Sequence, residues 1–333
     1  MNDLSEWERY GEYSYLPCGT LNSIKLKFFR KLSMGSYPHI VNFAITWKCN
    51  SKCRMCNIWR DADETEIPPE KVERIFSDKI FRKTKLVKLT GGEPTLHPQL
   101  PEIIRLISGL LPESRIAINT NAYPFERMKK VADECVRIRD DLIFSIGLDG
   151  IGDIHNHMRG RKCFQEVMKT VNYFEDLRRS KKVLFRFSFT ITPWNFRDLP
   201  GVVEFARERE TYVGFRVMHL DKLYRNESLK IKDGFINEFK HLLEELGNNY
   251  FKKHIGDRER NVRCFAFINS VFIDPYGYFH PCLYRDRIGE GELSKLWKGE
   301  EGKRIRNDIK NCSKCWSDCQ TLPNIIAEFG EFR

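Results

Sequence analysis

Short apolar runs alternate with longer amphipathic stretches from residue 38 to residue 220. This alternation is typical of repeated strand and helix units on a parallel sheet. The apolar runs predict strands near 40–46, 86–90, 115–120, 142–148, 183–191 and 212–219. The stretches between them predict helices at 68–77, 99–110, 125–137, 164–179 and 199–207. The sequence therefore predicts an α/β fold built on a parallel sheet.

One side of nearly every predicted strand is small or polar. In the fifth strand, Phe185, Phe187 and Phe189 alternate with Arg186 and Ser188. The corresponding positions of the other strands are Asn42, Ala44, Thr46, Lys88, Thr90, Ala117, Asn119, Ser145 and Gly147. A complete eight-stranded barrel fills its interior with branched apolar side chains. A polar interior therefore favours an open, curved sheet that holds a ligand, and a flat sheet with one wet face is the alternative.

The composition excludes several classes of protein. The 333 residues are 41% apolar, which suffices for a packed core and roughly two domains. No stretch approaches the roughly 18 uninterrupted apolar residues of a membrane span. The N-terminus, MNDLSEWERYGEY, lacks the cationic start and apolar run of a secretion signal, so we expect a cytoplasmic protein. The net charge of +10 allows anionic partners, although no nucleic-acid-binding module is recognisable.

The chain divides into four parts. Residues 1–37 form an N-terminal extension, residues 38–220 the strand and helix core, residues 221–260 a helical bridge, and residues 261–333 a small cysteine-rich module. The best helix of the bridge covers 235–246. In the last module we expect a hairpin of residues 270–274 and 278–280 around Gly277, followed by a basic helix over 293–308.

A basic helix is predicted in the N-terminal extension. Leu21, Ile24, Phe28 and Leu32 share one helical face, and Lys25, Lys27, Arg30 and Lys31 occupy the rest. Such a helix can dock on an anionic membrane surface or on a partner. More often it packs its apolar face against its own protein, and this is our expectation here.

Eight of the eleven cysteines fall into two groups, and a reducing cytosol keeps such thiols free for metal binding or catalysis. Cys49, Cys53 and Cys56 form the first group, in TWKCNSKCRMC, directly after the first strand. Three thiolates on one loop can hold three corners of a cubane iron–sulfur cluster and leave one iron without a protein ligand. A structural zinc site requires a fourth ligand, and the candidate His39 lies before the strand, too far from the three cysteines. We therefore expect an iron–sulfur cluster, with zinc as the alternative.

With this cysteine spacing the chain resembles the radical S-adenosylmethionine (SAM) superfamily, over residues 38–220 and beyond. The resemblance implies a partial (β/α)6 barrel and a [4Fe-4S] cluster that binds SAM. Gly91, Gly92, Glu93 and Pro94 resemble the GGEP loop of the superfamily, which holds the amino group of SAM. The glycines would let the backbone approach the ligand, and Glu93 would either join that contact or orient a neighbouring loop.

The resemblance also assigns residues after the later strands to SAM. Arg159 matches an arginine that faces the carboxylate of the methionine moiety. Ala122 stands where glycine is common in the superfamily. Asn119 and Asn121 resemble the superfamily's motif after the third strand, which implies that they belong to the SAM site. Ser145 and Asp149 would meet the ribose or its surroundings, and Thr192 and Asn195 would lie near the nucleoside.

The C-terminal cysteines resemble the auxiliary cluster modules called SPASM and twitch domains. Cys264-x12-Gly277-x4-Cys282 matches their opening pattern, in which the glycine lets the hairpin turn sharply. A full SPASM module takes seven cysteines for two clusters, so five cysteines favour the twitch form with one auxiliary [4Fe-4S] cluster. The resemblance implies Cys264, Cys282, Cys312 and Cys315 as ligands and Cys319 as the spare, and zinc is again the alternative.

The resemblance implies a radical oxidoreductase or modifying enzyme. Reductive cleavage of SAM would give methionine and a 5'-deoxyadenosyl radical, which removes a hydrogen atom from the substrate, and a ferredoxin or flavodoxin would supply the electron. We expect oxidation or modification of a small molecule in the polar interior of the sheet. Modification of a peptide or protein side chain is the second hypothesis, and a non-enzymatic zinc protein is the remote one.

Overall fold

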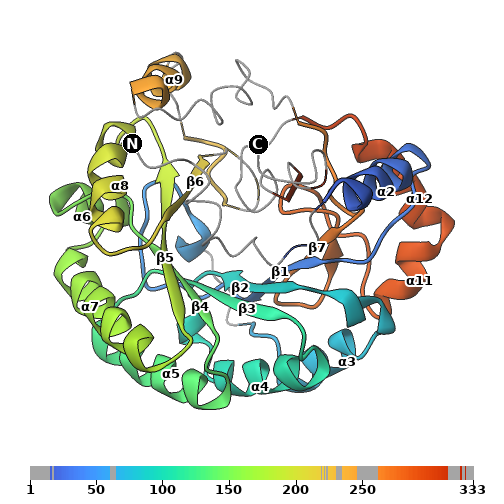
Figure 1. Ribbon diagram of the computed structural model, residues 1–333, viewed down its shortest axis with the longest axis horizontal. Helices are drawn as coiled ribbons and strands as arrows, with labels where there is room; N and C mark the ends of the chain where they lie inside the picture. Colours follow the sequence, from blue (N-terminus) through green and yellow to red (C-terminus); the bar gives the residue numbers. More distant parts are fainter. Residues whose placement is uncertain are drawn as a thin grey trace.

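A single mostly parallel sheet organises the molecule (Figure 1). The computed structural model describes residues 16, 19–60, 65–218, 220, 222, 224–229, 235–245, 262–313, 323, 324 and 327. The first six strands are β1 (Ile40–Thr46), β2 (Leu86–Gly91), β3 (Arg115–Thr120), β4 (Ile143–Gly147), β5 (Leu184–Ile191) and β6 (Val213–Val217). Each lies within two residues of its predicted bounds and pairs in parallel with its neighbour.

Helices connect the parallel strands and form the outer arc of Figure 1. They are α3 (Pro69–Phe76), α4 (Leu100–Leu110), α5 (Phe125–Ile138), α7 (Phe164–Ser180) and α8 (Leu199–Arg207). The sequence missed α6 (Asp153–Arg159), which lies between β4 and α7. Short 3-10 turns are η2 (Ile58–Arg60), η3 (Lys79–Lys83), η4 (Pro94–Leu96) and η5 (Phe196–Asp198). The helix predicted over 235–246 is α9 (Phe235–Glu245), and residue 246 lies outside the described residues.

The two faces of the sheet have different chemistry. The outward side chains, such as Phe43, Leu89 and Phe187, pack under the helices in one large apolar cluster. The inward side chains include Lys88 and Arg186, each only 2% exposed. The polar face is therefore buried inside the curve of the sheet, and the alternative of a flat sheet with one wet face is wrong.

The C-terminal module extends the same sheet. The described strands run in the order β6-β5-β4-β3-β2-β1-β7-β8, so the sheet ends at β6 and β8 and stays open. Strand β7 (Ser270–Ile273) pairs in parallel with β1, and β8 (Phe279–His280) pairs antiparallel with β7. The predicted hairpin is confirmed, and Gly277 has the positive φ of 82° that its turn requires. The partial barrel is likewise confirmed.

The predicted basic helix over 293–308 is interrupted. It consists of α11 (Leu293–Lys298) and α12 (Glu300–Ile309), because Gly299 between them has an extended backbone. Trp297 of α11 is buried and donates its indole N–H to the carbonyl of Ser36, at 2.7 Å. Arg306 of α12 donates to the carbonyl of Ser33, also at 2.7 Å. The N-terminal extension is thus fixed to the C-terminal module.

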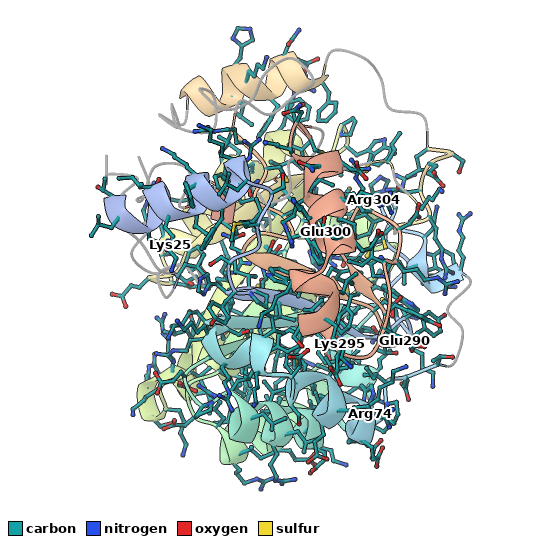
Figure 2. All side chains as sticks on the ribbon, turned by 90° about the vertical axis from the view of Figure 1, so that its right-hand side faces the viewer. Lys25, Arg74, Glu290, Lys295, Glu300 and Arg304 are labelled. Carbon is teal, nitrogen blue, oxygen red and sulfur yellow. The ribbon has the colours of Figure 1, made fainter. Side chains whose placement is uncertain are left out.

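The N-terminal helix α2 (Thr20–Lys31) does not pack as we expected from the sequence. Its predicted apolar face is exposed, and Leu26 on the other side is buried against Phe265 and Ile268. In Figure 1, and in Figure 2 from the side, α2 lies beside α12. The expectation failed because α2 is apolar on more than one side, and the pattern alone does not choose between them. Among the described helices, none has the length and apolar content to cross a bilayer.

Candidate functional site

A pocket lies where the parallel strands end, as expected for an open α/β sheet. It is a cavity of about 150 Å³. Its walls come from the loop after β1, from the C-terminal ends of β2, β3 and β4 with the loops after β2 and β3, from Arg159 of α6, and from inward side chains of β5 and β6. The lining residues are Cys49, Ser51, Cys53, Met55, Cys56, Ile58, Trp59, Thr90, Gly91, Gly92, Glu93, Asn119, Thr120, Asn121, Ser145, Gly147, Arg159, Ser188, Thr190, Arg216 and Tyr224.

Three free thiols face this pocket together. Cys49, Cys53 and Cys56 come from the loop after β1 and form no disulfide. Burial raises the pKa of Cys49 and of Cys56 to about 12, and the neighbouring Cys53 adds to both shifts. Burial also raises the pKa of Cys53, against the opposing charge of Arg159. Raised pKa values disfavour nucleophilic catalysis by these thiols, whereas a bound metal would stabilise their thiolate forms.

The arrangement fits a cluster rather than one metal ion. Within the described residues, no group of three Cys, His, Asp or Glu side chains converges on a single-ion site. The sulfurs of Cys49, Cys53 and Cys56 instead border a shared cavity. A cubane cluster offers a separate iron to each thiolate, whereas structural zinc needs four ligands around one centre.

The loop after β2 is packed tightly against the loop that carries the cysteines. The amide N–H of Gly92 donates to the carbonyl of Thr46, and that of Glu93 donates to the carbonyl of Lys48, each at 2.8 Å. A Cβ at Gly91 would lie 2.1 Å from the Thr46 oxygen, and one at Gly92 would lie 2.1 Å from the Lys48 oxygen. These glycines therefore also let the two loops approach each other, beyond the approach to a ligand that we expected.

Glu93 joins the loops after β2 and β3. Its buried carboxylate accepts hydrogen bonds from the amide and hydroxyl of Thr95, from the hydroxyl of Thr120 and from the amide of Asn121, at 2.7 to 3.2 Å. Burial raises the pKa of Glu93, and these hydrogen bonds oppose the shift. Asn121 in turn donates to Asn50 at 2.7 Å and to Ser51 at 3.0 Å in the cysteine loop. Three loops of the site are thereby held together.

The backbone after β3 keeps a left-handed path without glycine. Ala122 has a φ of 58°, and its N–H donates to the hydroxyl of Thr120 at 2.9 Å. Its carbonyl accepts from the hydroxyl of Thr170 at 2.9 Å. These bonds offset the cost of a left-handed alanine, which is about 1 kcal/mol.

A buried ion pair lies behind the cysteines. Arg159, at the end of α6, contacts Asp149 with 2.8 Å between Nη2 and Oδ2, and its Nη1 lies 3.8 Å from the Cys53 sulfur. Asp149 also accepts the amide of Thr190 at 2.7 Å. A Cβ at Gly147 would meet the Arg159 guanidinium at 2.1 Å, so this glycine makes room for it. Despite burial, Asp149 and Cys53 raise the pKa of Arg159, which therefore stays charged.

Three buried polar atoms of the pocket-lining residues have no hydrogen-bond partner among the described residues. They are Oδ1 of Asn119, Oγ of Ser145 and Nε of Arg159. Buried polar atoms in native proteins normally have partners, so these atoms indicate a bound group. A hydroxyl and an amide can hydrogen-bond to the ribose hydroxyls or to the amino and carboxylate groups of an amino acid, and SAM carries all of these groups. The residues present thus fit both a cluster and SAM.

Ten of the predicted SAM and first-cluster residues line the pocket, and others lie behind its wall. Pro94 begins η4 and is buried. Thr192 donates its amide and hydroxyl to Oδ1 of Asn195, at 2.8 and 2.7 Å, and Asp149 pairs with Arg159 as described above. These side chains shape the loops of the site. The ten that line the pocket are Cys49, Cys53, Cys56, Gly91, Gly92, Glu93, Asn119, Asn121, Ser145 and Arg159.

Sequence reasoning missed part of the pocket wall. Arg216 on β6 donates to the hydroxyl of Tyr224 at 2.8 Å and to that of Thr190 at 3.2 Å. Arg216 alternates with the core residue Phe215, so strand parity was the signal that could have found it. Trp59 follows the cysteine loop, and Tyr224 lies in the predicted bridge, where no pattern marked it.

Only part of the second cysteine group lies in the described structure. Cys264 is buried, and Cys282 and Cys312 are half-buried. All three contact or join the large apolar cluster of the sheet. Cys315 and Cys319 lie outside the described residues.

Comparison with family models finds two matches. A model of the radical SAM superfamily matches residues 44–206. A model of the SPASM iron–sulfur cluster-binding domain matches residues 264–320. The first match contains the pocket cysteines, and the second contains the C-terminal cysteines.

Two curated relatives have sequences similar to this chain, one over most of its length and the other over a smaller part. A probable GTP 3',8-cyclase from Metallosphaera sedula is 28% identical over 274 residues, which are 73% of this chain and 80% of that protein. An Fe-coproporphyrin III synthase from Methanosarcina barkeri is 24% identical over 210 residues, 59% of this chain and 50% of that protein. The chain therefore spans only about half the length of the second relative.

Solved structures share the fold at low sequence identity. SuiB from Streptococcus suis, bound to its precursor peptide SuiA, superposes with a TM-score of 0.64 at 16% identity, covering 86% of this chain and 71% of that one. The enzyme anSMEcpe with bound AdoMet gives a TM-score of 0.61 at 16% identity, and the superposition covers 82% of this chain and 83% of that one. These similarities support the fold.

Proposed function

Because this chain belongs to the radical SAM superfamily and ends in a SPASM iron–sulfur domain, we propose that it is an enzyme that removes a hydrogen atom from a small molecule and so oxidises or modifies it. Its cofactors are a [4Fe-4S] cluster and SAM. One observation carries the proposal: Cys49, Cys53 and Cys56 share a pocket with polar atoms of Asn119 and Ser145 that have no partner among the described residues, at the mouth of a polar sheet interior.

In this proposal the three pocket cysteines ligate the first cluster. When bound, the cluster and SAM together supply a low-potential electron and a carbon radical strong enough to break a C–H bond. Glu93 holds the loops after β2 and β3 in position for the methionine end of SAM. Ser145 and Asn119 would contact the polar groups of SAM. The buried pair of Asp149 and Arg159 keeps a fixed positive charge next to Cys53 and near the SAM carboxylate.

The interior of the sheet would hold the substrate. Lys88 and Arg186 are buried there, and Arg216 faces the pocket with Tyr224. A polar interior of this kind favours a substrate that carries polar groups. Enclosure by the sheet also excludes water and other hydrogen donors from the reacting C–H bond. The chain's part of the reaction is to position the substrate and protect it.

Two classes of substrate have support. The relatives from Metallosphaera sedula and Methanosarcina barkeri carry names of enzymes that act on small molecules, GTP and a coproporphyrin. The structural neighbours SuiB and anSMEcpe are recorded with bound peptides. We favour a small molecule, because the similarity to the cyclase extends over 73% of this chain at higher identity. Modification of a peptide side chain is the second candidate.

The remaining partners follow from the electron balance. The first cluster needs one electron for each SAM cleaved, and we propose a ferredoxin or flavodoxin as its donor. The C-terminal module would carry one auxiliary [4Fe-4S] cluster, with four of its five cysteines as ligands. When bound there, it would supply one-electron redox chemistry or a binding site for the substrate.

The proposal is tested by anaerobic reconstitution with iron and sulfide, followed by reaction with SAM and dithionite. We expect 5'-deoxyadenosine as a product. Candidate substrates carrying deuterium at their C–H bonds, a purine nucleotide and a peptide, then separate the two classes by transfer of deuterium into 5'-deoxyadenosine. A reconstituted protein that makes no 5'-deoxyadenosine would contradict the proposed reaction.

Ser145→Ala tests the SAM contact with little disturbance of the fold. The variant removes a buried hydroxyl that has no partner in the described protein, so we expect normal iron content and thermal stability. SAM affinity should fall about threefold to tenfold, the value of one hydrogen bond. Ser108→Ala is the matched control, because its buried hydroxyl on α4 also has no partner among the described residues but lies outside the pocket. Equal SAM affinity in the two variants would argue against the assignment.

A further inference from the structure

Helix α2 presents a continuous apolar face to solvent. Leu21, Ile24, Phe28 and Leu32 follow helical spacing, and their exposed fractions are 85%, 57%, 55% and 44%. Met34, just beyond the helix, is 45% exposed. Scattered single apolar residues are normal on a surface, but a contiguous group of large ones marks an interaction site.

The opposite face of α2 is fixed to the protein, so the helix does not turn its apolar face inward. Leu26 packs against Phe265 and Ile268. Arg30 donates from Nε to the carbonyl of Cys264 at 3.0 Å, and Lys310 donates from Nζ to the carbonyl of Lys31 at 2.9 Å. The helix is therefore held with Leu21 and Phe28 outward.

Lysines flank the exposed apolar face on both sides. Helical spacing puts Lys25 beyond one edge of the face and Lys27 and Lys31 beyond the other. The helix, TLNSIKLKFFRK, contains no acidic residue.

The neighbouring helix does not cancel this positive charge. On α12 the acids Glu300 and Glu301 pair with Lys303 at 3.8 Å and with Arg304 at 2.6 Å. In Figure 2, Lys25, Glu300 and Arg304 are labelled on this side of the molecule. Among the described residues, Lys25 and Lys31 thus carry positive charge beside the apolar face that the acids of α12 do not neutralise.

We propose that α2 docks this protein on the anionic surface of a phospholipid bilayer. The helix would lie in the plane of the interface, with Leu21, Ile24 and Phe28 at the level of the acyl chains and Lys25 and Lys31 extended to lipid phosphates. Apolar burial and attraction to anionic lipid then act together. A second copy of the chain on the same face would bring two sets of lysines together, so charge favours the lipid surface.

Vesicle sedimentation of the anaerobically reconstituted holoenzyme tests this proposal. The probes are vesicles of phosphatidylcholine alone and of phosphatidylcholine mixed with phosphatidylglycerol. We expect binding to the anionic vesicles at least about tenfold tighter than to the neutral ones, and weakened by salt.

Two double variants separate the apolar and the charged contributions. Leu21→Gln with Phe28→Gln should reduce binding to both kinds of vesicle about tenfold or more, while 5'-deoxyadenosine formation stays unchanged. Lys25→Gln with Lys31→Gln should remove the preference for anionic vesicles. The matched control, Leu184→Gln with Lys303→Gln, alters an exposed leucine on β5 and a lysine on α12 and should bind as the unmodified protein does.

Three results would overturn the proposal. One is the same vesicle binding in the Leu21 and Phe28 variant as in the unmodified protein. Another is a dimer in solution that this variant dissociates, with no vesicle binding, because a second copy would then cover the face. The third is vesicle binding that appears only after residues 1–15 are removed, since the chain itself would then occupy the face.

Discussion

Replacing Cys53 by alanine is expected to abolish formation of 5'-deoxyadenosine while leaving the C-terminal iron in place. Cys53 lies in the middle of the three pocket thiols, and a cubane with two protein ligands is exposed and labile. Iron content should fall from about eight to about four atoms per chain. The measurements are iron and sulfide content, Mössbauer spectra and 5'-deoxyadenosine under dithionite.

Two further cysteine variants make this result specific. Cys135→Ala changes a cysteine buried in the apolar core under the helices, so iron content and SAM cleavage should stay unchanged. Cys312→Ala should also leave about four iron atoms, but here SAM cleavage continues, because the first cluster is intact. A Cys53→Ala protein that still cleaves SAM would refute the assignment of the pocket cysteines, and zinc in the C-terminal module would refute the auxiliary cluster.

Replacing Glu93 by alanine is expected to cause the largest loss of stability among single changes in the pocket. The change leaves donors of Thr95, Thr120 and Asn121 buried without an acceptor. One such donor costs about 1 to 3 kcal/mol, so the free energy of unfolding should fall by about 3 kcal/mol or more. SAM affinity should fall at least about tenfold, because the loops after β2 and β3 lose their connection. Denaturant unfolding and SAM titration measure the two effects.

Glu113→Ala is the control for Glu93, since Glu113 is exposed between α4 and β3. It should change the free energy of unfolding by less than about 0.5 kcal/mol. Glu93→Gln keeps one acceptor oxygen, so its loss in the free energy of unfolding should lie between those of Glu93→Ala and Glu113→Ala. A loss of SAM affinity in Glu93→Ala with unchanged stability would mean that Glu93 contacts the ligand directly and does not organise the loops.

The sequence predicted the strands and the helices between them because local patterns carry that information. Parallel strands buried on one face by helices require apolar residues at every second position, and Phe185, Phe187 and Phe189 satisfy this directly. The same parity correctly put Lys88 and Arg186 inside the curve of the sheet. The cysteine spacing and its position after β1 were likewise local, and the residues that the radical SAM model matches contain them.

Contacts between distant segments were beyond the reach of the sequence. The pairing of β6 with β5 places Arg216 in the pocket wall, and the chain after β6 places Tyr224 there. Strand β7 joined the sheet beside β1, although more than 200 residues separate them in the chain. The residues of β1 and β7 do not predict that these strands pair, because parallel pairing depends on backbone groups that every residue possesses.

The sequence by itself determined the α/β fold, the cysteine ligands expected for the first cluster and the loops that surround it, since spacing and periodicity act over a few residues. Only the tertiary structure decided which oxygen of Glu93 meets which loop, why Gly147 must leave room for Arg159, and which face of α2 is covered. The reason in each case is physical. Hydrogen bonds and close packing form between segments that meet only in the folded chain. Helix α2 is apolar on two sides, and only its contacts with the rest of the protein determine which side is buried.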